Sequence, residues 1–492
     1  MTHSVLSSRL TQVPILPALR NLQKAYASAE VYVVGGAIRD ALLKRKGGDI
    51  DYLIRNVSYA NLARHLQKSG SAQLVGKHFG VIKYSPRGTK EIYDIALPRL
   101  EHSLHMSGAY HDFAVQSDPK LPVAEDLKRR DFTINAMAWN IHSGEFVDPS
   151  NGLADLVAKK IRTVGNPKQR FQEDYTRLLR ALRFAVELDF QIEDSSWRIL
   201  KQLIGNLSNR VLPREAIAAE LVKMFARAPL ATVDALENSG ALRVLMPEAH
   251  EMKRVVQPVL HHREGSVWQH AHLSLEAYTH PEFRRRFPKF KPDAELYFAT
   301  WMHDIAKSVT MKHVGSHSTK PHYKNHASVG AHMAVRIAER LKLSSAGGQI
   351  LPRRLDWLLR NHLVRLKVHE LDLDEVEHLF CNPNLPGEKL LALNFADAWA
   401  SIPEEGGHDL RDLDALMKKI ALVKKRGFKK GKPYHLLSGK DVMKGMQVSA
   451  GPQVGSFLSL VRYQQLEGKL LSKAAALKYL AQYYQSKLKK SS

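Results

Sequence analysis

The chain has 492 residues, of which 44% are hydrophobic, and this size and composition are typical of a folded protein with several domains. Lysine and arginine number 73 against 49 acidic residues, so the formal net charge is +24, which favours a polyanionic partner such as a nucleic acid. Cys381 is the single cysteine, which excludes an intramolecular disulfide and a cysteine-based metal site and indicates a reducing compartment. No apolar run reaches the roughly 18 residues that cross a bilayer, so we expect a soluble, cytoplasmic protein without a membrane partner. The sequence leaves the oligomeric state open.

The hydrophobic pattern divides the chain into four parts. Residues 1–150 mix short β-rich runs (31–34, 51–54, 81–84 and 91–97) with turns and helices, which predicts an α/β region. Residues 151–248 show helical spacing, including a predicted helix over 171–188, and residues 249–402 form a histidine-rich helical region. Residues 403–492 contain a basic run at 424–432 on a flexible, glycine-containing backbone, followed by a helical tail. A further amphipathic helix is expected at 17–26.

The first predicted strand, residues 31–34, runs directly into Gly35-Gly36, with Arg39 and Asp40 in the helix that follows. A buried strand that enters a glycine turn can bring backbone close to a bound group. We therefore expect this turn to hold a phosphate.

Asp49 and Asp51 lie two residues apart at the next predicted strand, where alternation would place both carboxylates on one face. Mg²⁺ binds through one or two carboxylates, waters and substrate phosphates, so this pair predicts a site for nucleotidyl transfer. Asp94, on the predicted strand at 91–97, is a candidate third carboxylate that would act on an attacking 3′-hydroxyl. A surface strand with solvated aspartates remains the alternative.

A charged segment at 125–135 leads straight into apolar residues, and within it Arg130, Asp131 and Asn135 could bind a triphosphate and ribose hydroxyls. The alternative is a salt-bridge network at the start of a helix.

In the predicted helix at 171–188, Asp174, Arg177 and Arg180 follow at three-residue steps on one side. A carboxylate accepts from the amino group of cytosine or adenine, and a guanidinium donates to cytosine N3 or adenine N1. Uracil and guanine present the opposite polarity, so such a pair would admit CTP and ATP and reject UTP and GTP. The alternative is an ordinary surface ion pair, worth about 0.2 to 0.5 kcal/mol.

The histidine-rich region contains a set of imidazoles and carboxylates within helical patterns, a combination that binds divalent metals between packed helices. Its members are His270, His303, Asp304 and Asp397, with His326 and His362 as candidates for a second metal.

Taken in this order, the segments from residue 31 to residue 248 resemble the class II tRNA nucleotidyltransferases, which are the bacterial CCA-adding enzymes and their relatives the poly(A) polymerases. The resemblance implies an α/β nucleotidyltransferase head (1–150) with a polymerase-beta-like mixed sheet and helices. An all-α neck (151–248), an HD body (249–402) and a tRNA-binding tail (403–492) would follow. It also implies template-independent addition of CCA to tRNA from CTP and ATP with Mg²⁺.

The resemblance also implies roles for individual residues. Asp49 and Asp51 would be the Mg²⁺ ligands, and Asp174 with Arg177 would be the amino-acid template for C and A. The triphosphate and ribose would be bound by Gly35, Gly36, Arg39, Asp40, Arg130, Asp131 and Asn135. The segment from Arg99 to Phe113 would be the flexible loop that changes the enzyme from CTP to ATP.

The order His270, His303-Asp304, Asp397 further resembles the HD phosphohydrolase domain that is fused to many bacterial CCA-adding enzymes. This implies a divalent metal of unknown identity and phosphatase or phosphodiesterase activity. Two other interpretations stay open: an A-adding specialist or poly(A) polymerase with the same head, and an RNA-binding or signalling protein that works through its HD domain.

Overall fold

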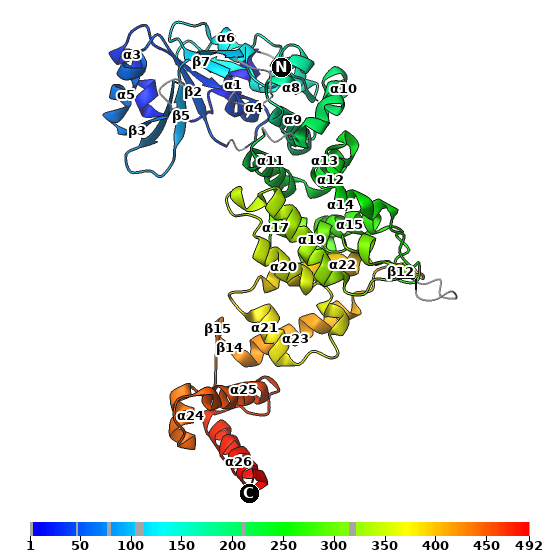
Figure 1. Ribbon diagram of the computed structural model, residues 1–492. Helices are drawn as coiled ribbons and strands as arrows, with labels where there is room; N and C mark the ends of the chain where they lie inside the picture. The colour runs from blue at the N-terminus through cyan, green and yellow to red at the C-terminus, as the bar shows by residue number, and fades with distance from the viewer. Residues whose placement is uncertain are drawn as a thin grey trace. The chain divides into compact units, whose positions relative to one another are not determined.

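The computed structural model describes residues 3–45, 48–75, 80–103, 113–208, 212–313 and 321–491. They belong to two compact units, Met1–Pro247 and Glu248–Ser492, and each unit is described by itself (Figure 1). The predicted parts 1–150 and 151–248 fall in the first unit and the other two in the second, while the finer division into four stays a prediction. Among the described residues, no helix combines the length and apolarity that a membrane crossing requires.

A seven-stranded mixed sheet forms the centre of the N-terminal half of the first unit. In spatial order its strands are β3 (Gly70–Val75), β4 (Val81–Pro86), β5 (Tyr93–Ala96), β2 (Asp51–Arg55), β1 (Glu30–Val34), β8 (Ala138–Asn140) and β9 (Phe146–Val147). Strands β2 and β5 are parallel, and the other neighbours are antiparallel. Residues 31–34 of β1 are all buried, as expected for β-branched and aromatic residues in an inner strand.

Short helices surround this sheet (Figure 1). They are α1 (His3–Leu10), α2 (Pro17–Arg20), α3 (Leu22–Ala25), α4 (Gly36–Leu42), α5 (Tyr59–Gln67) and α6 (Val123–Lys128). The prediction of a single helix at 17–26 was wrong, because the helical segment is interrupted at Asn21, which lies between α2 and α3. Asparagine competes with the helical backbone for hydrogen bonds and therefore favours such interruptions.

The ends of the segment expected to be a flexible loop, Arg99 to Phe113, pair with each other as strands. Strand β6 (Arg99–Ser103) is antiparallel to β7 (Phe113–Ser117). The centre of that segment, 104–112, lies outside the described residues.

The rest of the first unit is helical apart from the short parallel pair β10 (Lys160–Ile161) and β11 (Gln191–Ile192). Its helices are α7 (Gly152–Val157), α8 (Pro167–Glu173), α9 (Thr176–Leu188), α10 (Asp194–Leu203), α11 (Arg214–Arg227), α12 (Pro229–Ser239) and α13 (Ala241–Leu245). The one helix expected at 171–188 is in fact α8 and α9, since Asp174 between them has an extended backbone. The Asp174 carboxylate accepts hydrogen bonds from the backbone N–H and hydroxyl of Thr176, at 2.8 and 2.6 Å, and this local bonding replaces the helix there.

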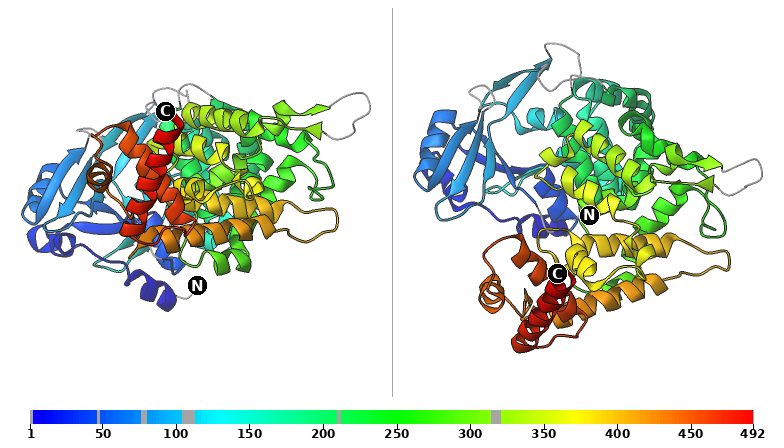
Figure 2. Two further views of the ribbon diagram at one scale, coloured as in Figure 1. Left: turned by 90° about the horizontal axis from the view of Figure 1, so that it is seen from below. Right: turned by 60° about the horizontal axis from the view of Figure 1, so that its bottom comes forward.

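The second unit is almost entirely helical in all views (Figures 1 and 2). Its helices are α14 (Pro247–His250), α15 (Val267–Glu276), α16 (Pro281–Arg286), α17 (Ala294–Met302), α18 (Lys307–Thr310), α19 (His326–Arg340), α20 (Pro352–Arg360), α21 (Leu373–Cys381), α22 (Gly387–Ala400), α23 (Arg411–Gly427), α24 (Gly439–Met446), α25 (Pro452–Leu466) and α26 (Lys473–Ser491). Two strand pairs interrupt them: β12 (Lys312–His313) with β13 (Pro321–His322), and β14 (Phe428–Lys429) with β15 (Lys432–Pro433).

The basic run at 424–432 is ordered rather than flexible, which differs from the sequence-based expectation. Helix α23 continues to Gly427, and the hairpin β14–β15 follows with Lys430 and Gly431 at its tip. Both tip residues have positive φ, at 51° and 75°, which matches the two-residue turn that suits a twisted hairpin.

Candidate active site and metal centre

Asp51 and Asp94 are brought together by the pairing of β2 and β5. Tyr52 is opposite Ile95 in this parallel ladder, so Asp51 and Asp94, each one residue earlier, share the other face of the sheet. Asp49 is exposed and precedes β2, which corrects the expectation that it lies on the strand. The antiparallel pairing of β1 with β2 ends at Asp51, because Asp51 pairs with Val34, the last residue of β1.

The three carboxylates influence one another electrostatically. Burial raises the pKa of Asp51; the charge of Arg130 opposes this shift, and the charges of Asp94 and Asp49 add to it. The carboxylate of Asp94 also accepts an ion pair from Lys83 at 2.9 Å. Carboxylates are protein ligands that Mg²⁺ takes, together with waters and substrate phosphates. Over the described ranges, however, the groups of three ligand atoms within 4.8 Å of one another all lie in the second unit.

Gly35 is required at the turn between β1 and α4 for two separate reasons. Its φ is +72°, and a Cβ added there would lie 2.6 Å from Nη1 of Arg130. Gly36 has ordinary helical surroundings, with its nearest neighbour, Nη2 of Arg39, at 3.5 Å from an added Cβ. The turn therefore places backbone directly against the Arg130 guanidinium.

Five of the predicted residues form one continuous set of hydrogen bonds beside this turn. Arg39 binds Asp40 through Nε at 2.9 Å and the side-chain oxygen of Asn135 through Nη1 at 2.7 Å. Asn135 in turn donates to Oδ1 of Asp131 at 3.2 Å. Arg180 of α9 donates to Oδ2 of Asp131 through Nε and Nη2, at 2.8 and 2.6 Å. Residues from three distant sequence motifs thus meet.

Burial of Asp131 would raise its pKa, but the charge and hydrogen bonds of Arg180, with the Asn135 amide, lower the pKa of Asp131 to about 2. The acid is therefore ionised at neutral pH and accepts from both partners.

Sequence reasoning gave no role to the residues that contact the arginines of α9 on their other side. Glu220 of α11 is hydrogen bonded to Arg183 and lies 3.8 Å from Nη1 of Arg180. The ring of Phe184 contacts the guanidinium groups of Arg39, Arg180 and Arg183 at 5.0, 5.4 and 4.1 Å from its centroid. The helical spacing of Arg180, Arg183 and Phe184 on α9 could have indicated this cluster.

Asp174 and Arg177, the predicted base-reading residues, each bond other partners in this structure. Arg177 is buried and donates through Nη1 to Glu173 at 2.7 Å and to the carbonyl of Arg170 at 2.9 Å. Asp174 instead bonds Thr176, so neither the facing pair nor the alternative surface pair between Asp174 and Arg177 is present. Glu173, which also pairs with Arg170 at 2.9 Å, was not considered from the sequence.

In the second unit, all six predicted metal-binding side chains converge. His270 Nε2 lies 3.2 Å from both His303 Nε2 and Oδ1 of Asp397, and His303 Nε2 lies 3.4 Å from Oδ2 of Asp304. On the other side of Asp304, its Oδ1 lies 3.4 Å from His326 Nε2 and 3.7 Å from His362 Nε2. Asp304 is therefore shared by two groups of three potential ligands.

The ring orientations suit metal binding through Nε2. The Nδ1 atoms of His303, His326 and His362 donate to the carbonyl oxygens of Thr300, Tyr323 and Leu359, at 2.6, 2.8 and 2.7 Å. Each acceptor lies three residues earlier in the chain, so the main chain itself fixes these rings. With the proton on Nδ1, a neutral ring presents the Nε2 lone pair to a cation.

Buried atoms without hydrogen-bond partners test whether these side chains fit a metal ion. Oδ1 of Asp304 and the Nε2 atoms of His326 and His362 are buried without a hydrogen-bond partner. Buried polar atoms normally find partners, and three that face one another are explained by a cation between them. Lys307 at 2.6 Å from Asp304 and Arg365 at 3.1 Å from Asp397 balance the two carboxylates, and neither was identified from the sequence.

Comparisons with known proteins agree with this architecture. The family model described as the poly A polymerase head domain matches residues 31–162. A multifunctional CCA protein of Xanthomonas euvesicatoria is 33% identical over 319 residues, which are 64% of this chain and 71% of the relative. The protein of the same name from Halorhodospira halophila is 29% identical over 337 residues, which cover 68% of this chain and 74% of the relative.

Among solved structures, the Thermotoga maritima CCA-adding enzyme in complex with tRNA has a TM-score of 0.59. The alignment covers 97% of this chain and 98% of that one, and at 20% identity it concerns the fold. The expected fold class, a mixed-sheet nucleotidyltransferase head followed by helices, is thereby confirmed. The Xanthomonas euvesicatoria relative exceeds 30% identity, and the alignment covers more than two thirds of its length. The chain therefore belongs to the family of multifunctional CCA proteins, the bacterial CCA-adding enzymes.

Proposed function

We propose that this protein adds C, C and A to the 3′ end of tRNA without a nucleic-acid template, using CTP and ATP and releasing pyrophosphate. The observation that carries the proposal is the hydrogen-bonded set from Arg39 through Asn135 and Asp131 to Arg180, beside the Gly35 turn and Asp51. This set of hydrogen bonds connects α4 and the segment 131–135 of the nucleotidyltransferase head to α9, the helix that carries the proposed base-reading residue Arg177. The names of the relatives support the same activity.

In this proposal each part of the set has a task. Arg39 and Arg130, on either side of the Gly35 turn, bind phosphate oxygens through their guanidinium groups. Asp131 and Asn135 hold the ribose hydroxyls, and Arg180 keeps Asp131 ionised and oriented. Asp49 and Asp51 would hold Mg²⁺, which supplies neutralisation of charge on the reacting phosphate and on the leaving pyrophosphate. Asp94 would act on the attacking 3′-hydroxyl as the third carboxylate.

Base selection is assigned to Asp174 and Arg177. In the structure without nucleotide, Arg177 is bound to Glu173, so reading a base requires the guanidinium to exchange that partner or to use its remaining N–H groups. A carboxylate acceptor next to a guanidinium donor fits cytosine and adenine and mismatches uracil and guanine.

The experiment uses a tRNA that ends at the discriminator base, with CTP alone, ATP alone or both, and resolves product length on a sequencing gel. The proposal predicts growth by two residues with CTP and by three with both nucleotides, with release of pyrophosphate. Addition of a single A only to tRNA that already ends in CC would establish an A-adding specialist instead, and long A tracts would indicate a poly(A) polymerase.

We further propose that the second unit is a metal-dependent phosphohydrolase, with His270, His303, Asp304 and Asp397 around one divalent ion. His326 and His362 would hold a second ion together with Asp304. The three unpaired buried atoms at this centre support the proposal. The bound ions would supply an activated water and charge neutralisation at a phosphate ester.

The corresponding assay follows hydrolysis of 2′,3′-cyclic AMP and p-nitrophenyl phosphate by the full chain with Mg²⁺, Mn²⁺, Co²⁺ or Ni²⁺. Hydrolysis that is lost in His303→Ala and retained in Asp51→Asn would support the proposal. Absence of hydrolysis with every metal, or equal loss in both variants, would contradict it. Both activities would operate in the cytoplasm; a single cysteine, which forms no intramolecular disulfide, is compatible with that reducing compartment.

A further inference from the structure

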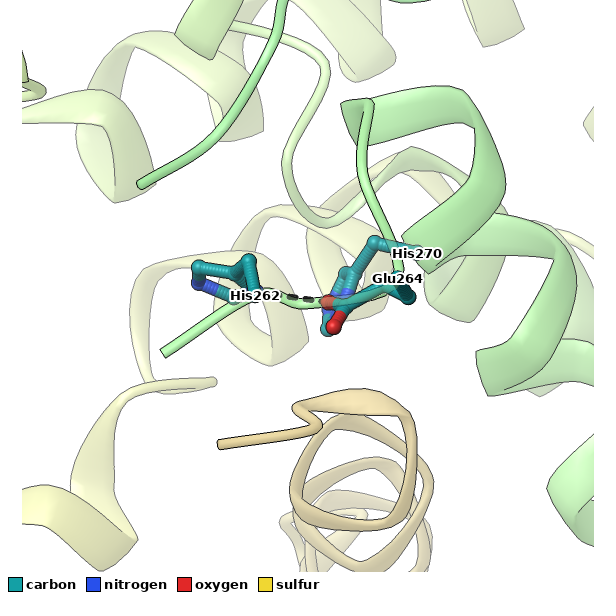
Figure 3. Close-up of side chains that lie close together, drawn as sticks. All are labelled: His262, Glu264 and His270. Atoms are coloured by element: carbon teal, nitrogen blue, oxygen red, sulfur yellow. Dashed lines mark hydrogen bonds and ion pairs between the residues drawn. The ribbon is translucent and has the colours of Figure 1, made fainter. Parts of the chain in front are cut away.

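Three side chains next to the metal centre form a separate cluster in which one carboxylate oxygen serves two histidines. Oε1 of Glu264 accepts from Nδ1 of His262 at 2.7 Å and from Nδ1 of His270 at 2.8 Å, as Figure 3 shows. Oε2 accepts from the backbone N–H of Ile402 at 3.0 Å. The Glu264 side chain is only 1% exposed, so these protein donors take the place of water.

This cluster has the composition of a metal site, since its ligand atoms lie within 4.8 Å of one another. Its hydrogen bonds indicate a different role. Unlike Asp304, His326 and His362, none of its three residues has an unpaired buried atom among the described side chains. The Nδ1 atoms of His262 and His270 already donate to Glu264.

The role of Glu264 becomes clear from a comparison of the four histidines at the metal centre. Three of them are fixed through Nδ1 by a carbonyl three residues earlier in their own segment. His270 is different, because its Nδ1 donates to a side chain that precedes α15. A carboxylate can only accept, so Nδ1 of His270 carries a proton and donates it to Glu264, which leaves Nε2 as the ring atom that faces His303, Asp397 and an ion bound between them.

Glu264 also connects two elements that carry ligands. His270 is on α15, while Ile402 follows α22, the helix that carries Asp397. Besides the Glu264 bond, the backbone N–H of Arg263 donates to the carbonyl of Ile402 at 2.8 Å. Gly265, with φ of +107°, makes the turn that lets the chain leave Glu264 and enter α15 at the capping residue Ser266.

We infer that Glu264 is the positioning residue of the metal centre: it sets the proton of His270 on Nδ1, aims Nε2 at the ion, and holds α15 against the end of α22. The inference rests on the proposed metal-dependent function of the second unit. Carboxylate partners of metal-bound histidines typically change metal affinity by 10- to 100-fold when they are removed. His262, the second donor to the same oxygen, is not one of the six predicted metal-binding side chains and is the matched control.

The test measures Mn²⁺ binding by calorimetry and the visible spectrum of bound Co²⁺, on the full chain. All proteins carry Asp51→Asn, so that ions at the first unit do not contribute. Into this background we would place Glu264→Ala, Glu264→Gln and His262→Phe, and the melting temperature of each metal-free protein would be recorded.

Glu264→Ala is expected to bind Mn²⁺ about 10- to 100-fold more weakly and to change the Co²⁺ spectrum. Glu264→Gln keeps one acceptor oxygen of the same size and is expected to recover part of the affinity, and His262→Phe to bind within about threefold of the parent. A Glu264→Ala protein with the parent's affinity and spectrum would overturn the inference, even if its melting temperature fell, because that result describes a purely structural role. If Glu264→Ala does not fold, an unchanged affinity in Glu264→Gln together with an unchanged Co²⁺ spectrum would overturn it equally. A parent that binds no Mn²⁺ at all would instead contradict the metal centre itself, and the positioning role with it.

Discussion

At the scale of single residues, the candidate active site depends on a few charged side chains whose neighbours decide what they can do. Asp51 is partly buried, and burial raises its pKa; the charge of Arg130 opposes this shift, while the charges of Asp94 and Asp49 add to it. Carboxylates whose charges repel one another favour a divalent ion, since the ion removes the repulsion.

Asp51→Asn is therefore expected to lower nucleotide addition by at least about 10²-fold, because the substitution removes a metal ligand and leaves the phosphate charge uncompensated. Single-turnover rates with CTP measure this, and Mn²⁺ binding by the second unit serves as the folding control. Retention of more than a tenth of the parent rate would show that Asp51 is not a ligand.

Arg177→Ala is expected to raise incorporation of U and G relative to C and A by about 5- to 150-fold, the range of one good base-edge contact. The matched variant is Arg177→Lys, which keeps the charge but lacks the forked donors. Competition between the four nucleotides, with tRNA affinity measured in parallel, distinguishes selection from binding. If Arg177→Ala lost tRNA affinity and kept its selectivity, the assignment of the template would be wrong.

At the scale of elements, the site is built by two connections: the turn from β1 into α4, and the packing of α9 against the segment that carries Asp131. In the first, glycine conformation sets the geometry. In the second, the arginines of α9 reach acids from other elements.

Gly35→Ala is expected to destabilise the protein by about 1 to 3 kcal/mol, because its φ of +72° and the nearby Arg130 leave no room for a Cβ. The neighbouring change, Gly36→Ala, meets ordinary contact distances inside a helix and is expected to be neutral or slightly stabilising. Urea unfolding of the two variants measures the difference, and equal stability would contradict the account of this turn.

Arg180→Met is expected to cost about 2 kcal/mol at neutral pH, the value of holding the pKa of Asp131 near 2 instead of 3.8. Because the folded-state pKa is the lower one, this stabilisation is complete above about pH 4 and is lost as the pH falls towards 2. Unfolding free energies of variant and wild type should therefore converge over that window. Lys128→Met, which breaks the exposed pair with Glu125, is the control and should cost less than about 1 kcal/mol at any pH. A constant difference for Arg180→Met down to pH 2 would exclude the Asp131 pair as its cause.

The sequence predicted which residues form the candidate site better than it predicted the contacts between them. Spacing alone located Asp131, Asn135 and Arg180, yet it could not show that they bond one another, because they come from segments about 45 residues apart whose packing depends on the whole sheet. Asp174 was placed in a helix because its neighbours have helical periodicity, and its own side chain broke that helix. Glu264 was missed, since a lone acidic residue in a loop has no pattern that marks it as a partner of His270.

At the scale of the whole molecule, the two compact units hold separate candidate sites. The first unit holds the carboxylates, the glycine turn and the arginines of nucleotidyl transfer, and the second holds the histidine centre. The formal charge of +24 suits a partner as anionic as tRNA. Each activity should therefore respond to substitutions within its own unit.

One measurement tests the central claim most directly: sequencing of the 3′ ends of a tRNA that lacks CCA after incubation with the full chain, Mg²⁺ and all four nucleotides at equal concentration. The account predicts that extended molecules end in C, C and A in that order and then stop, and that chelation of Mg²⁺ prevents extension. Ends of mixed sequence, or addition that continues beyond the third residue, would contradict it.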